Sequence, residues 1–250
     1  TIRLKSALPT ITAPVVIDGA TQLGYQGQNF VRVDCENAGI MGLRADKARL
    51  VLNALDLYNC KSRGLDVNGG NDHLITKVNV TYDVGGRQGN GIQLTGTSGA
   101  VIRGCTTHGR VSGIYATNGF DVTIQDNDIG DAGANHNEAG IVVRQYSAKK
   151  LPGGLLVSGN KFSNGSASHF IIDQLTGVHI ADKAGPNVNV VLERSKGFGT
   201  AKSYAMYLKK CTTCTVTGVD VSGPTGGTRT GIGLQADGSK NLVVKDCKAH

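Results

Sequence analysis

Hydrophobic residues recur along the chain in two registers. In the first register a glycine precedes an aliphatic residue, at intervals of 22 or 27 residues: Gly42-Leu43, Gly64-Leu65, Gly91-Ile92, Gly113-Ile114 and Gly140-Ile141. In the second, one aliphatic residue recurs at Leu52, Ile75, Ile102, Ile124, Val157, Leu192, Val216 and Val244. A fixed period of this length indicates one supersecondary unit stacked repeatedly as a solenoid. We expect about eight coils.

Within each unit, apolar and polar residues alternate as they do in strands. Leu65 and Val67 are expected to face inward and Asp66 outward, and the next two units place Gln93 and Tyr115 outward in the same way. No window has a sustained helical period. Asn127 and Asn160, at matching turn positions, predict stacked side-chain amides. The pattern therefore predicts an all-β solenoid of stacked parallel strands.

Several segments carry a family resemblance. These are Gly-Ile-Tyr-Ala at 113–116, Asp-Val-Thr-Ile-Gln-Asp-Asn-Asp-Ile at 121–129, Gly-Leu-Leu-Val-Ser-Gly-Asn-Lys-Phe at 154–162 and the lead-in strand at 8–19. They resemble coils of the right-handed parallel β-helix, or pectate-lyase-like, superfamily over roughly Phe30 to His250. A propeller is the alternative, but its blades need about 40 residues each. We expect an N-terminal lead-in or cap at 1–29 and one right-handed parallel β-helix domain at 30–250.

The composition of the chain favours some classes of binding partner over others. A net charge of +7 favours an acidic partner, such as an anionic polysaccharide or a nucleic acid. Lysine and arginine are scattered and no nucleic-acid-binding motif is present, so we expect no nucleic acid. No apolar stretch approaches the roughly 20 residues of a membrane-spanning helix, so we expect no membrane insertion.

Cysteine usage and the two ends of the chain give further expectations. Six cysteines are too few for a disulfide scaffold, and Cys105 and Cys247 are expected to be small buried residues. Cys211 and Cys214 form a single CxxC, which without a second pair indicates a local disulfide or two thiols rather than zinc.

Thr1 begins the sequence without a signal peptide, which is consistent with a removed leader. The sequence stops within a coil at His250, where we expect further chain or a partner subunit.

Long connections mark one corner of the coil as the functional side. They enter the glycine-led strands at 82–90, 106–112, 130–139, 164–169, 195–203 and 222–230. Catalytic candidates at this corner and on the adjoining strand face are His108, Arg110, Tyr115, His136 and Arg144. Substrate-binding candidates are Arg87, Gln93, Tyr146, Gln174, Tyr207 and Lys209.

The resemblance implies a lyase, epimerase or hydrolase that acts on a polysaccharide, often an acidic one, and a secreted or cell-surface protein. In β-elimination a cation neutralises the uronate carboxylate, a base removes the C5 proton and an acid protonates the departing oxygen. Arg110 and Arg144 suit neutralisation, His136 or His108 suits the base, and Tyr115 suits the acid. We expect a lyase or C5 epimerase on these grounds.

Residues 135–147 are distantly similar to an Asn-x-x-Glu…Ile-Arg stretch of alginate and chondroitin lyases, although the arginine here lies further from the glutamate. The similarity implies a calcium ion on Glu138, with Asp131 as a second candidate ligand. No other cofactor is indicated.

Two alternatives stay open. A glycoside hydrolase needs two carboxylates about 5 to 10 Å apart, and Asp131 or Glu138 with Asp173 or Asp83 are candidate pairs. A non-catalytic adhesin or tailspike-like sugar-binding protein is consistent with the lack of a complete catalytic motif and with the uncovered C-terminal coil.

Overall fold

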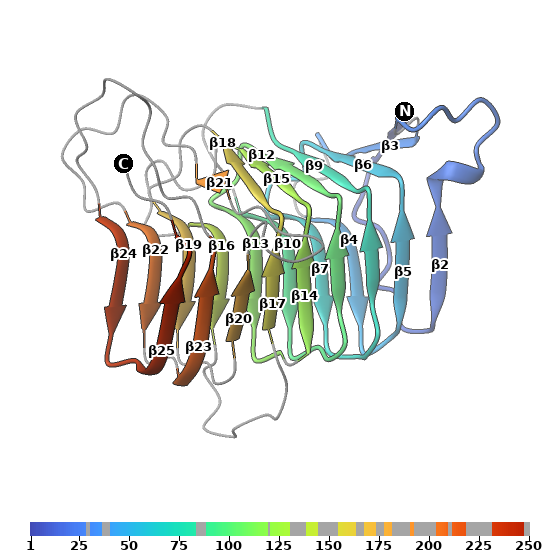
Figure 1. Cartoon of the computed structure of the whole chain (residues 1–250). Helices are drawn as coiled ribbons and strands as arrows, with labels where there is room; N and C mark the ends of the chain where they lie inside the picture. Colours follow the sequence, from blue (N-terminus) through green and yellow to red (C-terminus); the bar gives the residue numbers. More distant parts are fainter. Residues whose placement is uncertain are drawn as a thin grey trace.

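The computed structural model describes residues 1–28, 31–36, 41–83, 89–119, 121–130, 139–144, 155–163, 168–173, 178–181, 191–192, 204–209, 212–218 and 232–247. In this part of the chain, strands are the dominant element and the single helix is the short 3-10 turn η1 (Gly19–Thr21). The strands form three parallel sheets that wind around one axis, and successive strands advance along it (Figure 1). The predicted all-β parallel β-helix is confirmed.

The three sheets, named A, B and C here, contain eight, eight and nine strands among the described residues. Sheet B holds the glycine-led strands β4 (Met41–Asp46), β7 (Arg63–Asn68), β10 (Asn90–Thr95), β13 (Ser112–Thr117), β16 (Ala139–Arg144), β19 (Ser168–Asp173), β22 (Tyr204–Lys209) and β24 (Ile232–Asp237). Sheet C holds β2 (Val15–Asp18), β5 (Leu50–Asn53), β8 (Leu74–Thr76), β11 (Val101–Arg103), β14 (Val122–Gln125), β17 (Leu155–Ser158), β20 (Val178–Ala181), β23 (Thr212–Thr217) and β25 (Lys240–Lys245). Sheet A holds β1 (Ile2–Arg3), β3 (Val31–Asp34), β6 (Leu55–Tyr58), β9 (Asn79–Thr81), β12 (Thr106–His108), β15 (Asp128–Gly130), β18 (Lys161–Ser163) and β21 (Val191–Leu192).

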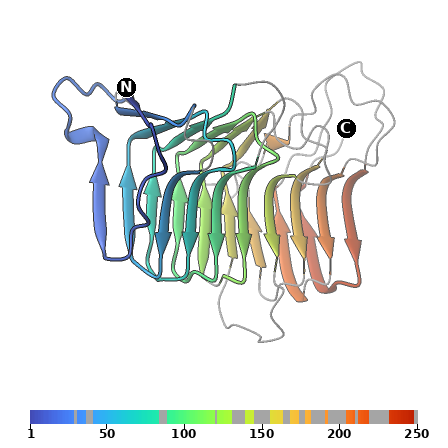
Figure 2. The same ribbon diagram turned by 180° about the vertical axis from the view of Figure 1, so that it is seen from behind.

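One coil passes from sheet B to sheet C to sheet A and then returns to sheet B, as the view from behind also shows (Figure 2). Every strand pairing among the described residues is parallel and in register, so equivalent residues of neighbouring coils lie about 4.8 Å apart. The sequence period therefore becomes rows of side chains that run along the solenoid.

The inward rows form a continuous apolar core. Ile92 pairs with Leu65 and Ile114, and Ile114 pairs with Ile141, all fully buried. The glycine that precedes each of these residues lies where sheet A turns into sheet B. A β-carbon on Gly64 would overlap Cγ1 of Val80, an inward residue of sheet A. The glycine period thus marks a corner at which the core leaves no room for a side chain.

Two sequence expectations about the strands are wrong. Leu192 does not belong to the second register: it lies in β21 of sheet A and pairs with Phe162, while Ile180 of sheet C stands between Val157 and Val216. Both strands carry a short aliphatic pattern, and only the spatial pairing separates them. The connection 106–112 is also not all loop, because Thr106–His108 forms β12.

The predicted amide stack is confirmed. Asn127 Nδ2 donates to Oδ1 of Asn160 at 2.8 Å, and Asn127 Oδ1 accepts from the backbone N–H of Cys105 at 2.9 Å. Both asparagines are buried. The stack satisfies polar groups at the turn between sheets C and A, which would otherwise be left unpaired inside the protein.

The N-terminal segment contributes to all three sheets. β1 pairs with β3, β2 pairs with β5, and Ile11 forms a bridge to Ala45 of β4. The division into a cap at 1–29 and a helical domain at 30–250 stays a prediction.

Candidate functional site

The outward face of sheet B brings several of the predicted residues together. Its central row follows the strand register through Arg44, Asp66, Gln93, Tyr115, Val142, Ile171, Tyr207 and Gln235. A second row, two residues further along each strand, includes Thr117, Arg144, Asp173 and Lys209. Gln93, Tyr115, Arg144, Tyr207 and Lys209 therefore share one face, as predicted from their spacing.

Arg144 and Tyr115 are in direct contact on this face. Arg144 Nη1 donates to the Tyr115 hydroxyl at 3.2 Å, and its guanidinium carbon lies 5.8 Å from the centre of the Tyr115 ring. Both side chains are partly exposed. A cation and a phenol thus lie side by side where a ligand on sheet B would meet them.

Tyr115 and Tyr207 also pack against Val142, which is fully buried. The Tyr207 hydroxyl lies 3.5 Å from Oδ2 of Asp237. Two half-buried aromatic side chains around an aliphatic residue make an amphipathic surface, apolar on the ring faces and polar at the hydroxyls. Arg144 and the partly exposed Lys209 lie beside this surface in the second row.

His108 lies elsewhere. It belongs to β12 of sheet A and pairs with Thr81, on the face that also carries Tyr58. On that face the Tyr58 hydroxyl donates to Oδ2 of Asp83 at 2.8 Å, and this bond raises the Tyr58 pKa. His108 and Asp83 are thus placed with sheet A, away from the Arg144–Tyr115 contact on sheet B.

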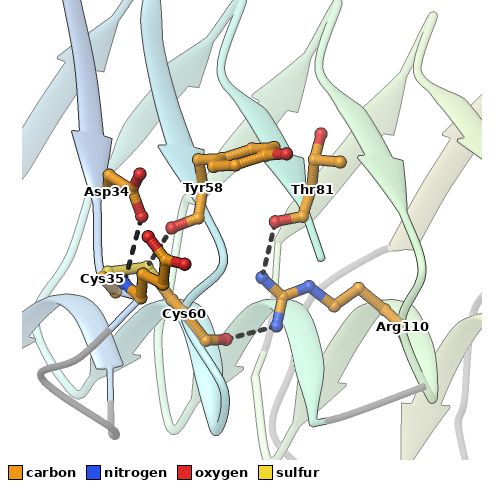
Figure 3. The surroundings of a disulfide bond; sticks show 7 residues. Asp34, Cys35, Tyr58, Cys60, Thr81 and Arg110 are labelled. Carbon is orange, nitrogen blue, oxygen red and sulfur yellow. Dashed lines mark hydrogen bonds between the residues drawn. A yellow bond between two sulfur atoms is a disulfide. The ribbon is translucent and has the colours of Figure 1, made fainter. Parts of the chain in front are cut away.

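Arg110 is not a surface residue, which corrects the sequence expectation. Its side chain is fully buried, and its guanidinium donates to the carbonyl oxygens of Cys60 at 2.6 Å and Thr81 at 3.4 Å (Figure 3). The guanidinium also lies 5.4 Å from the centre of the Tyr82 ring. Burial disfavours the charged form and lowers the Arg110 pKa to about 10. Arg110 is a buried tie between coils and cannot neutralise a ligand on the surface of sheet B.

Cys35 and Cys60 form a disulfide that the sequence reasoning missed (Figure 3). Their sequence separation of 25 residues equals about one coil, which places both at the same corner of consecutive coils. The disulfide could have been predicted from this spacing of one coil between the two cysteines. The disulfide joins two coils, and Arg110 attaches the next two to the same corner through Cys60 and Thr81.

The other cysteine expectations have mixed outcomes. Cys105 is buried as predicted, and burial raises its thiol pKa to about 12, so it is not a nucleophile at neutral pH. Cys247 is exposed, contrary to expectation. It follows β25, where no further described strand covers the inward positions.

Six candidate residues lie outside the described part of the chain. These residues are Arg87, Asp131, His136, Glu138, Tyr146 and Gln174. Cys211, the first cysteine of the CxxC, also lies outside the described part. Within the described ranges, no group of three or more His, Cys, Asp or Glu side chains is arranged to hold a metal ion. The described residues also contain no helix long and apolar enough to cross a bilayer.

Three in-register parallel sheets around a single apolar core define the class of the protein, a parallel β-helix with a mixed aromatic and cationic face. The sequence matches the family described as the right handed beta helix region over residues 38–200, more than half of the chain. The chain belongs to this right-handed β-helix family. Comparison with curated proteins and with solved structures gives no match.

Proposed function

We propose that the protein binds an acidic polysaccharide along the outward face of sheet B and acts on it by β-elimination or C5 epimerisation. The observation that carries this proposal is the 3.2 Å contact between Arg144 Nη1 and the Tyr115 hydroxyl. Tyr207 and Lys209 on the same face extend the surface that a chain-like ligand would contact. The net charge of +7 favours an anionic substrate.

The two side chains suit the chemistry of a uronate. The Arg144 guanidinium neutralises the carboxylate, which makes the neighbouring C5 proton more acidic. When a base removes that proton, the electron pair forms the C4–C5 double bond and the C4–O bond breaks. The Tyr115 hydroxyl then gives its proton to the departing oxygen. In epimerisation the C5–H bond that the base breaks is replaced by a new C5–H bond on the opposite side, and the glycosidic C4–O bond stays intact. His136 remains the candidate base.

The test uses a panel of polyuronates, including polygalacturonate, alginate and chondroitin. β-Elimination produces the ultraviolet absorbance of an unsaturated uronate, whereas epimerisation in D2O incorporates deuterium at C5 without that absorbance. Tyr115→Phe and Arg144→Ala should each lower kcat by about 100-fold or more. Tyr58→Phe and Arg103→Ala, which remove the same groups from sheets A and C, should leave kcat unchanged. Wild-type turnover in both site variants would contradict the proposed roles.

A non-catalytic sugar-binding function is the second candidate, and the packing of Tyr115 and Tyr207 around Val142 favours it independently. Such an amphipathic surface suits the apolar faces of sugar rings. Saturable binding of a polyuronate with neither absorbance nor deuterium incorporation would select this candidate over the enzyme.

The Cys35–Cys60 disulfide supports a secreted or cell-surface location, because disulfides persist mainly in oxidising compartments. Fractionation of the source cells with an antibody against the protein would test this location.

A further inference from the structure

A pair of arginines lies on the outward face of sheet B, in the first coils. Arg63 Nη1 is 3.0 Å from Oδ2 of Asp66, and Arg44 Nε is 4.0 Å from the same oxygen. The Asp66 side chain is only 5% exposed, whereas those of Arg44 and Arg63 are 37% and 35% exposed. One covered carboxylate thus holds two guanidinium groups that reach the surface.

The described residues do not provide hydrogen-bond acceptors for all N–H groups of this arginine pair. Arg44 Nε is shielded from solvent and has no hydrogen-bond partner among the described residues, and at 4.0 Å its contact with Asp66 is an ion pair without a hydrogen bond. Each guanidinium has five N–H donors, and the hydrogen bond that Asp66 accepts in this pair comes from Arg63 Nη1. A guanidinium can donate two parallel N–H bonds to two oxygens of a carboxylate or sulfate group, which an ammonium group cannot do.

The neighbouring polar side chains extend this surface toward Tyr115. In the next coil Asn90 Nδ2 donates to Oε1 of Gln93 at 2.8 Å, and Gln93 stands directly between Asp66 and Tyr115 in the central row. Asp66 and Tyr115 are two strands apart, which is about 10 Å at the usual strand spacing. The arginine pair is therefore on the same surface as the Arg144–Tyr115 contact and more than one sugar ring away from it.

We infer that Arg44 and Arg63, held by Asp66, form a second anion subsite that binds a carboxylate or sulfate group of the polysaccharide. This inference rests on the proposed function, and it specifies the substrate further: a polyanion that carries acidic groups on more than one unit along the chain. A long oligouronate contacts both subsites, whereas a monosaccharide uronate occupies one of them at a time.

The test follows the Nε–H signals of Arg44 and Arg63 by NMR during titration with oligogalacturonates of increasing length and with inorganic sulfate. These signals report on the two side chains whether or not the sugar is turned over, so a failure of the catalytic proposal is distinguishable from a failure of this subsite. We expect saturable shifts of both signals, with affinity increasing with oligomer length. Arg63→Ala and Arg44→Ala should each weaken binding of a long oligomer by about tenfold.

Arg103→Ala is the matched control, because Arg103 is an exposed arginine on the outward face of sheet C. It lowers the net charge equally and should leave affinity unchanged. Arg63→Lys, which keeps the charge and disturbs packing least, should weaken binding by an intermediate amount if the planar guanidinium is used. Equal weakening by Arg103→Ala, or Nε–H signals that do not move at saturating oligomer, would overturn the subsite.

Discussion

Buried polar side chains connect neighbouring coils at the residue scale. Asn127 and Asn160 join the turns between sheets C and A, and Arg110 donates to carbonyl groups of two other coils. His73 does the same between sheets B and C: its Nδ1 accepts from the Leu50 backbone N–H at 3.1 Å, and its Nε2 is 3.0 Å from the Gly69 carbonyl oxygen. Since Nδ1 accepts, Nε2 carries the proton, and His73 is neutral in this arrangement.

We therefore predict that His73 makes stability fall as pH falls. Burial lowers the His73 pKa below its ordinary value of 6.5, so the unfolded chain takes up a proton at a pH where the folded chain does not. The stabilisation is present above about pH 6.5 and decreases below it, by up to about 1.4 kcal/mol per pH unit until the lowered pKa is reached. Denaturant unfolding between pH 8 and pH 5 would measure this slope.

His73→Asn is the control for that slope, because the asparagine oxygen can still accept from Leu50 while the side chain no longer titrates. The variant should show a shallower decrease between pH 8 and pH 5. Identical slopes for the two proteins would mean that His73 is not responsible.

Sequence reasoning failed for Arg110 and for the Arg44–Asp66 pair, whose partners are distant in the chain. Arg110 donates to carbonyl groups 50 and 29 residues earlier, and its local sequence gives no sign of burial. Arg44 and Asp66 are 22 residues apart, one short coil, and no local pattern marked them as a pair. The outward row from Gln93 through Tyr115 to Tyr207 was predictable, because it depends only on strand alternation and the repeat.

At the scale of the element, the strands and corners could be predicted from the sequence wherever the repeat is regular. The glycine-led strands from β4 to β16 were predictable, because a corner without room for a β-carbon requires glycine. The assignment of Leu192 failed because sheets A and C share the same short aliphatic pattern. Pairing between coils, rather than local sequence, decides which sheet such a strand joins.

At the corner glycine, Gly64→Ala should destabilise the protein by about 2 kcal/mol through overpacking against Val80. Val80→Ala removes the closest overlapping group, while the Gly91 carbonyl oxygen stays 2.9 Å from the added β-carbon. The double variant should therefore lose less stability than the two single variants together, with a coupling energy of about 1 kcal/mol. Equilibrium unfolding of the four proteins measures this cycle.

Gly96→Ala is the contrasting variant. Nothing lies within 4 Å of a β-carbon at Gly96, but its φ of 63° is unfavourable for alanine, so strain alone should destabilise by about 1 kcal/mol. Val80→Ala should not relieve that strain. Additive effects for Gly64 and Val80 would contradict the steric explanation of the glycine period.

A solenoid has neighbour contacts only, so at the scale of the whole molecule stability varies along its axis. The inward positions of the middle coils are fully covered, as Ile124 in β14 shows, whereas Val244 at the equivalent position of β25 is 45% exposed. We predict that, in the chain of residues 1–250 by itself, backbone amides of β25 exchange with deuterium much faster than those of β14. Hydrogen exchange with mass spectrometry would measure both peptides, and equal protection would contradict a graded stability.

The in-register rows also determine where along sheet B a bound polymer would lie. The row changes residue type at every step, from Asp66 to Gln93 to Tyr115 to Val142, instead of repeating one contact. A ligand that slid by one strand, about 4.8 Å, would exchange the Tyr115 phenol for an amide or an aliphatic group. A bound polymer consequently has one preferred alignment of its units with the strands of sheet B, which favours discrete binding positions over continuous sliding.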